Sequence, residues 1–242
     1  MSAFTLKIIA LILMIIDHIG NFFPNVEGVL FMRILGRVVA PIFFYMLVEG
    51  FIYTSDRRKY ANRLLTFAGV MFVGNFILAM IINVFKIPVM YKINPLLPNI
   101  FLSMFLGLII LGDIEKINFR TTALDERGEF KDKKTIYISM IRIIICSILS
   151  LFTEMSIYGL MMIFVFYIFR RKPVLKTLFY VIGSILLCIL KANLIQVFMI
   201  FAIFPLLFYN GKKGYSSPKS KYFFYIFYIA HIWLFVIISF FY

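Results

Sequence analysis

The chain has 242 residues, of which 63% are hydrophobic and 15% are charged. Soluble domains are about half apolar and about a quarter charged, so this composition excludes an ordinary soluble protein. The net charge is +14, but its lysines and arginines fall in short clusters between apolar segments, where they orient membrane proteins. We therefore expect one membrane domain over residues 1–242, with the lipid bilayer and not nucleic acid as its main partner.

Long apolar runs follow one another along the chain. A helix needs about 20 apolar residues to cross a bilayer, and the runs here are continuous rather than alternating, which favours helices over a membrane barrel. The expected segments are 5–23, 28–53, 62–85, 96–112, 136–153, 155–169, 175–190, 193–209 and 222–241. We predict an all-α, polytopic integral membrane bundle of about nine transmembrane helices, within a range of about eight to ten.

Basic residues between the segments predict the orientation, because cytoplasmic loops are enriched in lysine and arginine. Most of the 25 basic residues fall on the side that holds the N-terminus. The N-terminus is therefore expected to be cytoplasmic. The hydrophilic segment 113–135 is expected to form a cytoplasmic loop on the same side.

The first two apolar segments carry charged side chains. Asp17 and His18 lie toward the outer end of the first segment, and Arg33 and Arg37 lie in the outer half of the second. The two arginines are four residues apart and share one helical face, and Pro41 is expected to kink the helix one turn later. Charges at bilayer depth cost several kcal/mol each and by default mark a pathway or an active site.

Further polar residues fall at a similar depth in later segments. Asn99 opens the fourth segment, Glu154 lies in the turn between the fifth and sixth, and His231 lies near the middle of the last. We expect them to line an outward-facing cavity that positions an acceptor. For His231 alone, a hydrogen-bonded interior histidine is the simpler interpretation.

This combination of residue types suits group transfer. A histidine beside a carboxylate accepts a proton from an amine or hydroxyl, and the carboxylate fixes its tautomer. Arginines stabilise an oxyanion or grip phosphates. A proton-coupled transporter could use the same residues, and Asp17 could instead form a structural ion pair with Arg33 or Arg37. No phosphate-binding loop, zinc-protease motif or dinucleotide fingerprint is present, and no metal is expected.

A series of short motifs runs through nearly the whole chain. They are Leu6-Lys7-Ile8-Ile9-Ala10, Met14, Asp17-His18, Gly20, Arg33-Ile34-Leu35-Gly36-Arg37, Pro41-Ile42-Phe43, Glu49-Gly50-Phe51, Lys59-Tyr60, Arg63-Leu64, Asn99, Tyr158-Gly159, Pro205, Tyr209-Asn210-Gly211-Lys212 and Phe227-Tyr228 before His231. In these motifs the chain resembles the TraX family, whose founding member is associated with N-terminal acetylation of pilin. That family is in turn similar to a wider group of transmembrane acyltransferases. The chain departs from the pattern at Glu154 and Ile229-Ala230, where relatives often have Asp and Pro.

The resemblance implies a bacterial cytoplasmic-membrane acetyltransferase. Acetyl-CoA would be the cytoplasmic donor, and an amine (pilin-like) or a hydroxyl of a peptide, sugar or lipid would be the acceptor on the far side. His18 would be the catalytic base, oriented by Asp17, with Arg33 and Arg37 stabilising the oxyanion or thioester. The phosphates of acetyl-CoA are expected near the basic run that follows the second segment, Arg57, Arg58 and Lys59. A transporter and a non-enzymatic assembly factor remain alternatives.

Overall fold

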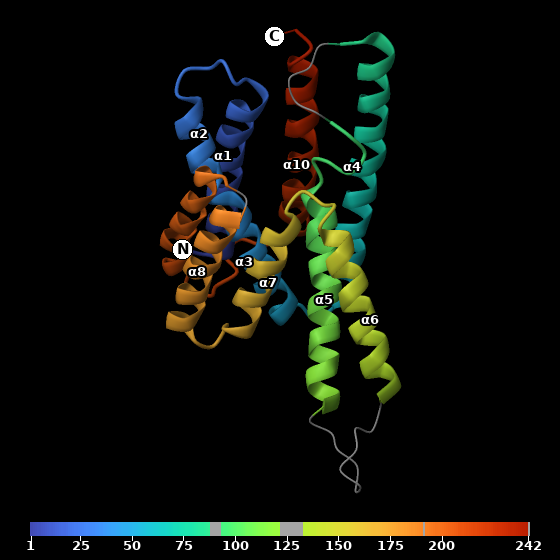
Figure 1. The fold of residues 1–242 in the computed structure, drawn as a ribbon, viewed down its shortest axis with the longest axis vertical. Coiled ribbons are helices and arrows are strands. Elements are labelled where there is room, and N and C mark those ends of the chain that lie inside the picture. Colours follow the sequence, from blue (N-terminus) through green and yellow to red (C-terminus); the bar gives the residue numbers. More distant parts are fainter. Residues whose placement is uncertain (88–92, 122–132, 191, 242) are drawn as a thin grey trace, which may run out of the picture.

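The computed structural model describes residues 1–87, 93–121, 133–190 and 192–241. Throughout these residues the regular structure is helical (Figure 1). Five helical stretches are long and apolar enough to cross a membrane, which confirms an all-α membrane-type protein. They are α1 (Ala3–Phe22), the stretch Val29–Tyr53 that holds α2 (Val29–Gly36) and α3 (Val39–Tyr53), α4 (Arg57–Phe85), α8 (Pro173–Leu190) and α10 (Pro218–Ile238).

The remaining helices are α5 (Ile100–Thr121), α6 (Lys133–Ser150), α7 (Ser156–Ile168), the 3-10 helix η1 (Leu194–Ala202) and α9 (Ile203–Leu207). Each of the nine segments expected from the sequence overlaps a helix, although the number that cross a bilayer and the side of the N-terminus stay predictions. The segment expected as a loop at 113–135 is helical at its start, because α5 continues to Thr121. Residues 122–132 of that segment lie outside the described residues.

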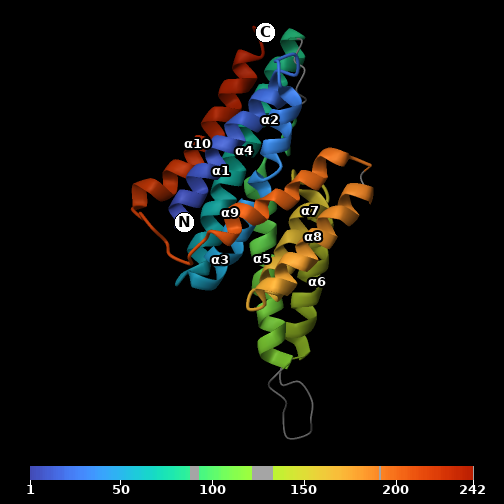
Figure 2. The same cartoon turned by 90° about the vertical axis from the view of Figure 1, so that its left-hand side faces the viewer.

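The helices lie in an upper and a lower part of the molecule as Figure 1 shows it. In the upper half of Figure 1, α1 and α2 lie on one side and α4 and α10 on the other, while α5 and α6 extend together to the lower end. Figure 2 shows α7 beside α5 and α6, and α8 next to α7, with η1 and α9 together running across the bundle. α1 contacts α2, α3 and α10, so residues on its different faces meet different neighbours.

Apolar side chains cover both the interior and much of the surface. α1 and α3 supply the centre of the core, where Leu6, Ile42 and Leu47 are fully buried. α4 and α6 instead expose large apolar side chains, among them Val73, Ile77, Ile141, Ile144 and Ile148. Apolar surface on this scale would be unstable in water, whereas a lipid environment tolerates it.

The second apolar segment is broken, as Pro41 predicted. The backbone N–H of Arg37 bonds to the carbonyl of Ile34 rather than to that of Arg33, and the N–H of Val38 bonds to Leu35. Pro41 itself has no N–H to offer the carbonyl of Arg37. The break therefore separates α2 from α3 and leaves the carbonyl of Arg33 available for a side chain.

Candidate active site

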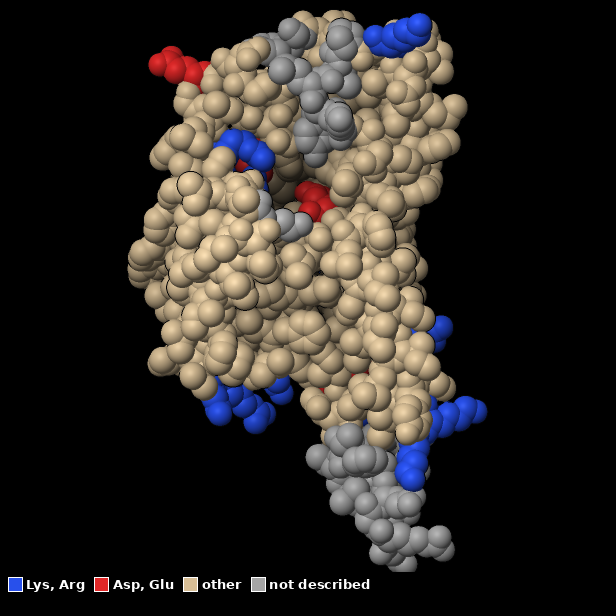
Figure 3. Space-filling view, viewed as in Figure 1, with Lys and Arg blue, Asp and Glu red and all other residues tan. Residues whose placement is uncertain are grey.

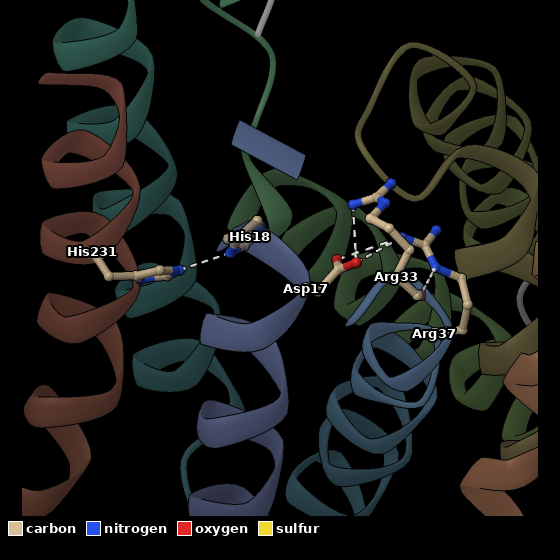
Figure 4. Close-up of polar contacts among 5 residues, drawn as sticks. All are labelled: Asp17, His18, Arg33, Arg37 and His231. Atoms are coloured by element: carbon tan, nitrogen blue, oxygen red, sulfur yellow. Dashed lines mark hydrogen bonds and ion pairs between the residues drawn. The ribbon is translucent and has the colours of Figure 1, made fainter. Parts of the chain in front are cut away.

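Asp17 on α1 forms ion pairs with both arginines of the next segment (Figure 4). Its Oδ1 accepts hydrogen bonds from Nη1 of Arg33 at 2.9 Å and from Nη2 of Arg37 at 3.0 Å. Nε of Arg37 also donates to the carbonyl of Arg33 at 3.2 Å, which uses the acceptor freed by the helix break. The structural ion pair that was an alternative interpretation of Asp17 is thus present. The two guanidinium groups and one carboxylate together carry a net charge of +1.

Small residues allow α2 to approach α1 closely enough for these bonds. A Cβ atom added at Gly36 would overlap the side chain of Asp17. Gly20 faces the same helix from α1, where an added Cβ would lie 3.2 Å from Cβ of Met32. Gly36 therefore permits the contact between Asp17 and Arg37.

His18 points away from this ion pair. Successive residues of an α-helix are about 100° apart, and the next residue after Asp17 accordingly faces α10 (Figure 4). Nδ1 of His18 lies 2.9 Å from Nε2 of His231. Nδ1 of His231 lies 2.8 Å from the carbonyl oxygen of Phe227, one turn earlier in α10. Both histidines are buried.

One predicted role is wrong in its geometry. Asp17 was expected to orient His18, but its carboxylate is engaged by the two arginines, and His231 is the hydrogen-bond partner of His18. The reason is the helical step between adjacent residues, which sends the two side chains to different neighbouring helices.

Two of the residues expected to position an acceptor are linked through a third. Tyr228 donates from its hydroxyl to Oε2 of Glu154 at 2.9 Å, and its ring meets that of His231 edge-on at 5.6 Å. Asn99 has a different role, since its amide donates to the carbonyl of Ala68 and its oxygen caps the start of α5. From the sequence, Tyr228 was named only within a motif and was given no role. Its position three residues before a histidine was the available signal.

The face of the molecule shown in Figure 3 is hollowed near its middle, with basic atoms on one rim and acidic atoms on the other. The Asp17 and Arg33 side chains keep 16% and 28% of their surface exposed. The ion-pair cluster therefore reaches accessible space and is not sealed in the core.

The three residues predicted to bind the donor phosphates are engaged elsewhere or point outward. Arg57 pairs with Glu115 and donates to the carbonyl of Phe51. Lys59 pairs with Asp56, whose pKa is lowered by the backbone N–H of Lys59. Arg58 is exposed. None of the three lines the cavity between α1, α3, α4, α5 and α10.

A cavity of about 330 Å³ lies between α1, α3, α4, α5 and α10. Its basic lining residues are Lys7, Arg63, Lys213 and Lys221. Glu49 is the acidic one, and apolar residues such as Leu47, Met104 and Phe224 complete the wall. Tyr228 also lines the cavity, so the cavity reaches the residue that connects Glu154 with His231. From the sequence, these four cations were interpreted only as signals of membrane orientation, because they come from separate segments.

The described residues hold no group of three or more histidine, cysteine or carboxylate side chains that could bind a metal. Cys146 and Cys188 are both free and buried. The candidate site therefore consists of the two histidines, the Asp17 ion-pair cluster and the basic cavity.

Comparison with known proteins assigns the chain to a family. The family described as TraX protein matches residues 2–239. A probable fimbrial assembly protein FimC, serogroup H1, of Dichelobacter nodosus is 40% identical over 68 residues, which is 27% of this chain and 28% of that protein. The chain thus aligns with less than a third of that relative's length. No solved structure matches significantly. Because the family match spans nearly all helices, the chain belongs to the TraX family.

Proposed function

We propose that this TraX-family protein is a membrane acetyltransferase that moves the acetyl group of acetyl-CoA to an amine of a pilin or fimbrial subunit. The observation that supports this most is the basic cavity, because it reaches Tyr228 beside the His18–His231 pair. The match to a protein named for fimbrial assembly favours this acceptor class over a sugar or lipid hydroxyl.

The cavity fits the donor by charge and by size. Its four cations against one carboxylate, Glu49, leave an excess of positive charge for the phosphates of coenzyme A. A volume of about 330 Å³ is at the small end of ligand pockets. This volume suits the narrow pantetheine arm, and the basic lining residues would hold the phosphates of the nucleotide. The donor would accordingly contact Lys7, Lys213 and Lys221 rather than the predicted run Arg57, Arg58 and Lys59.

His18 and the ion-pair cluster have separate roles in this proposal. His18 takes the proton from the attacking amine. Arg33 and Arg37, with Asp17 between them, lie on another face of α1, and the field of their fixed net positive charge would favour the oxyanion of the thioester carbonyl. The ion pair also fixes the arginines, so little reorganisation is needed during reaction.

The test uses membrane vesicles and acetyl-labelled acetyl-CoA. We expect label in the peptide fraction with the wild type and none with His18→Gln, at equal protein abundance in the membrane. Label in a sugar or lipid fraction would change the acceptor class. Substrate flux that needs no acetyl-CoA, together with no His18-dependent label, would contradict the proposal and favour the transporter alternative.

A further inference from the structure

We infer that His231 is a positioning residue that fixes the proton of His18 on Nδ1 and so keeps the lone pair of Nε2 available as the base. This inference rests on the proposed function for its catalytic consequence, whereas the hydrogen-bond arrangement itself does not depend on it. Nothing in the chemistry of a lone histidine selects this tautomer, so the neighbour must do so.

The carbonyl of Phe227 determines the state of His231. A carbonyl oxygen only accepts hydrogen bonds, and it lies 2.8 Å from Nδ1 of His231. Nδ1 of His231 therefore carries a proton. In a neutral ring the other nitrogen, Nε2, is then an acceptor.

The state of His231 in turn determines that of His18. Nε2 of His231 lies 2.9 Å from Nδ1 of His18, and since Nε2 accepts, Nδ1 of His18 must donate. Nε2 of neutral His18 is left with its lone pair. This atom has no hydrogen-bond partner among the described residues. It is not fully buried either, so it keeps some accessible surface.

Aromatic contacts hold both rings in this arrangement. The ring of His231 stacks on Phe227 with centroids 5.3 Å apart and an interplanar angle of 19°, and it meets Phe235 edge-on at 6.0 Å. The His18 ring meets Phe22 edge-on at 6.2 Å. These contacts fix the ring planes. A half-turn of either ring about its Cβ–Cγ bond would place a carbon where a nitrogen now meets the carbonyl of Phe227 or the other histidine, and would break that hydrogen bond, so the hydrogen-bond chain has one direction.

The transfer step balances with this tautomer. The neutral amine nitrogen forms a bond to the thioester carbonyl carbon while Nε2 of His18 takes the amine proton. The carbon–sulfur bond then breaks, the coenzyme A thiolate leaves, and the proton held on Nε2 is returned to it. During the step the imidazolium of His18 keeps its Nδ1–H bond to His231, which needs no rearrangement.

The tautomers can be read directly by ¹⁵N NMR of histidine-labelled protein in lipid nanodiscs, because the chain contains only two histidines. We expect both neutral rings to show a protonated Nδ1 and an unprotonated Nε2 in the wild type. Spectra of His18→Gln and His231→Gln assign the signals. A neutral His18 with its proton on Nε2 would overturn the inference, whether or not the protein transfers acetyl groups.

Kinetics of two His231 variants give the catalytic readout. In His231→Gln the amide oxygen takes the place of Nε2 as acceptor, and we expect kcat close to that of the wild type. In His231→Phe the acceptor is lost at similar volume, and we expect kcat to fall about tenfold or more with KM for acetyl-CoA unchanged. Equal losses in both variants would indicate a packing role only. Correct tautomers with no transfer by the wild type would refute the proposed function and leave this inference standing.

Discussion

Asp17→Asn tests the ion-pair cluster most sharply, because it removes one charge and keeps the shape of the side chain. Two guanidinium groups would then face each other without a counterion, at positions where the Arg33 and Arg37 side chains are 28% and 17% exposed. Removing one partner of a buried pair costs about 3–5 kcal/mol. Since these side chains are partly exposed, we expect a loss of about 2–3 kcal/mol in the free energy of unfolding.

Trp233 provides the assay as the chain's one tryptophan, since it lies on α10 and donates to Asn75 on α4 at 3.2 Å. Thermal unfolding followed by its fluorescence in nanodiscs should show a midpoint lower by about 5–10 °C for Asp17→Asn. Asp56→Asn is the matched control, because Asp56 forms an exposed pair with Lys59 and asparagine caps a helix as well as aspartate does. Equal midpoints for the two variants would refute the role of the cluster. Adding Arg37→Gln to Asp17→Asn should recover part of the loss, because it removes one of the two uncompensated charges.

Three further predictions concern packing, the donor and the acceptor side. Gly36→Ala should lower the unfolding midpoint and activity together, because its Cβ would overlap the ion-paired aspartate, whereas Gly69→Ala, which has open space around it, should not lower them. Lys213→Ala should raise KM for acetyl-CoA at unchanged kcat, whereas Arg58→Ala, at an exposed position outside the cavity, should leave both unchanged. A raised KM only in Arg58→Ala would instead place the donor phosphates at the run Arg57 to Lys59. Tyr228→Phe removes the hydroxyl that donates to Glu154 in the α6–α7 turn. It should lower the free energy of unfolding by about 1–2 kcal/mol, measured by Trp233 fluorescence. An unchanged free energy of unfolding would contradict a stabilising role of that hydrogen bond.

The sequence predicted the helices well because apolar length is a local property. All nine expected segments overlap helices, and Pro41 correctly indicated a break in the second. The pairing of Asp17 with Arg33 and Arg37 was also accessible, since it needs only two consecutive helices and their known spacing.

The remaining features of the site depend on contacts between distant segments. His18 and His231 are 213 residues apart. Their spacing predicts a similar depth, but it does not predict that α1 and α10 are neighbours. The cavity likewise combines Lys7 from α1 with Lys213 and Lys221 from near the other end of the chain. A basic run such as Arg57 to Lys59 stands out in a sequence, whereas cations assembled by packing do not.

The most direct test of the central claim uses the purified protein in lipid nanodiscs, labelled acetyl-CoA and a peptide with a free N-terminal amine taken from a pilin subunit. The rate of formation of the acetylated peptide is measured by mass spectrometry for the wild type and for His18→Gln. We expect product from the wild type and a rate at background for the variant, because glutamine cannot accept the proton. Product at the same rate from both proteins would contradict the assignment of His18 as the base, and no product from either would contradict the transfer itself.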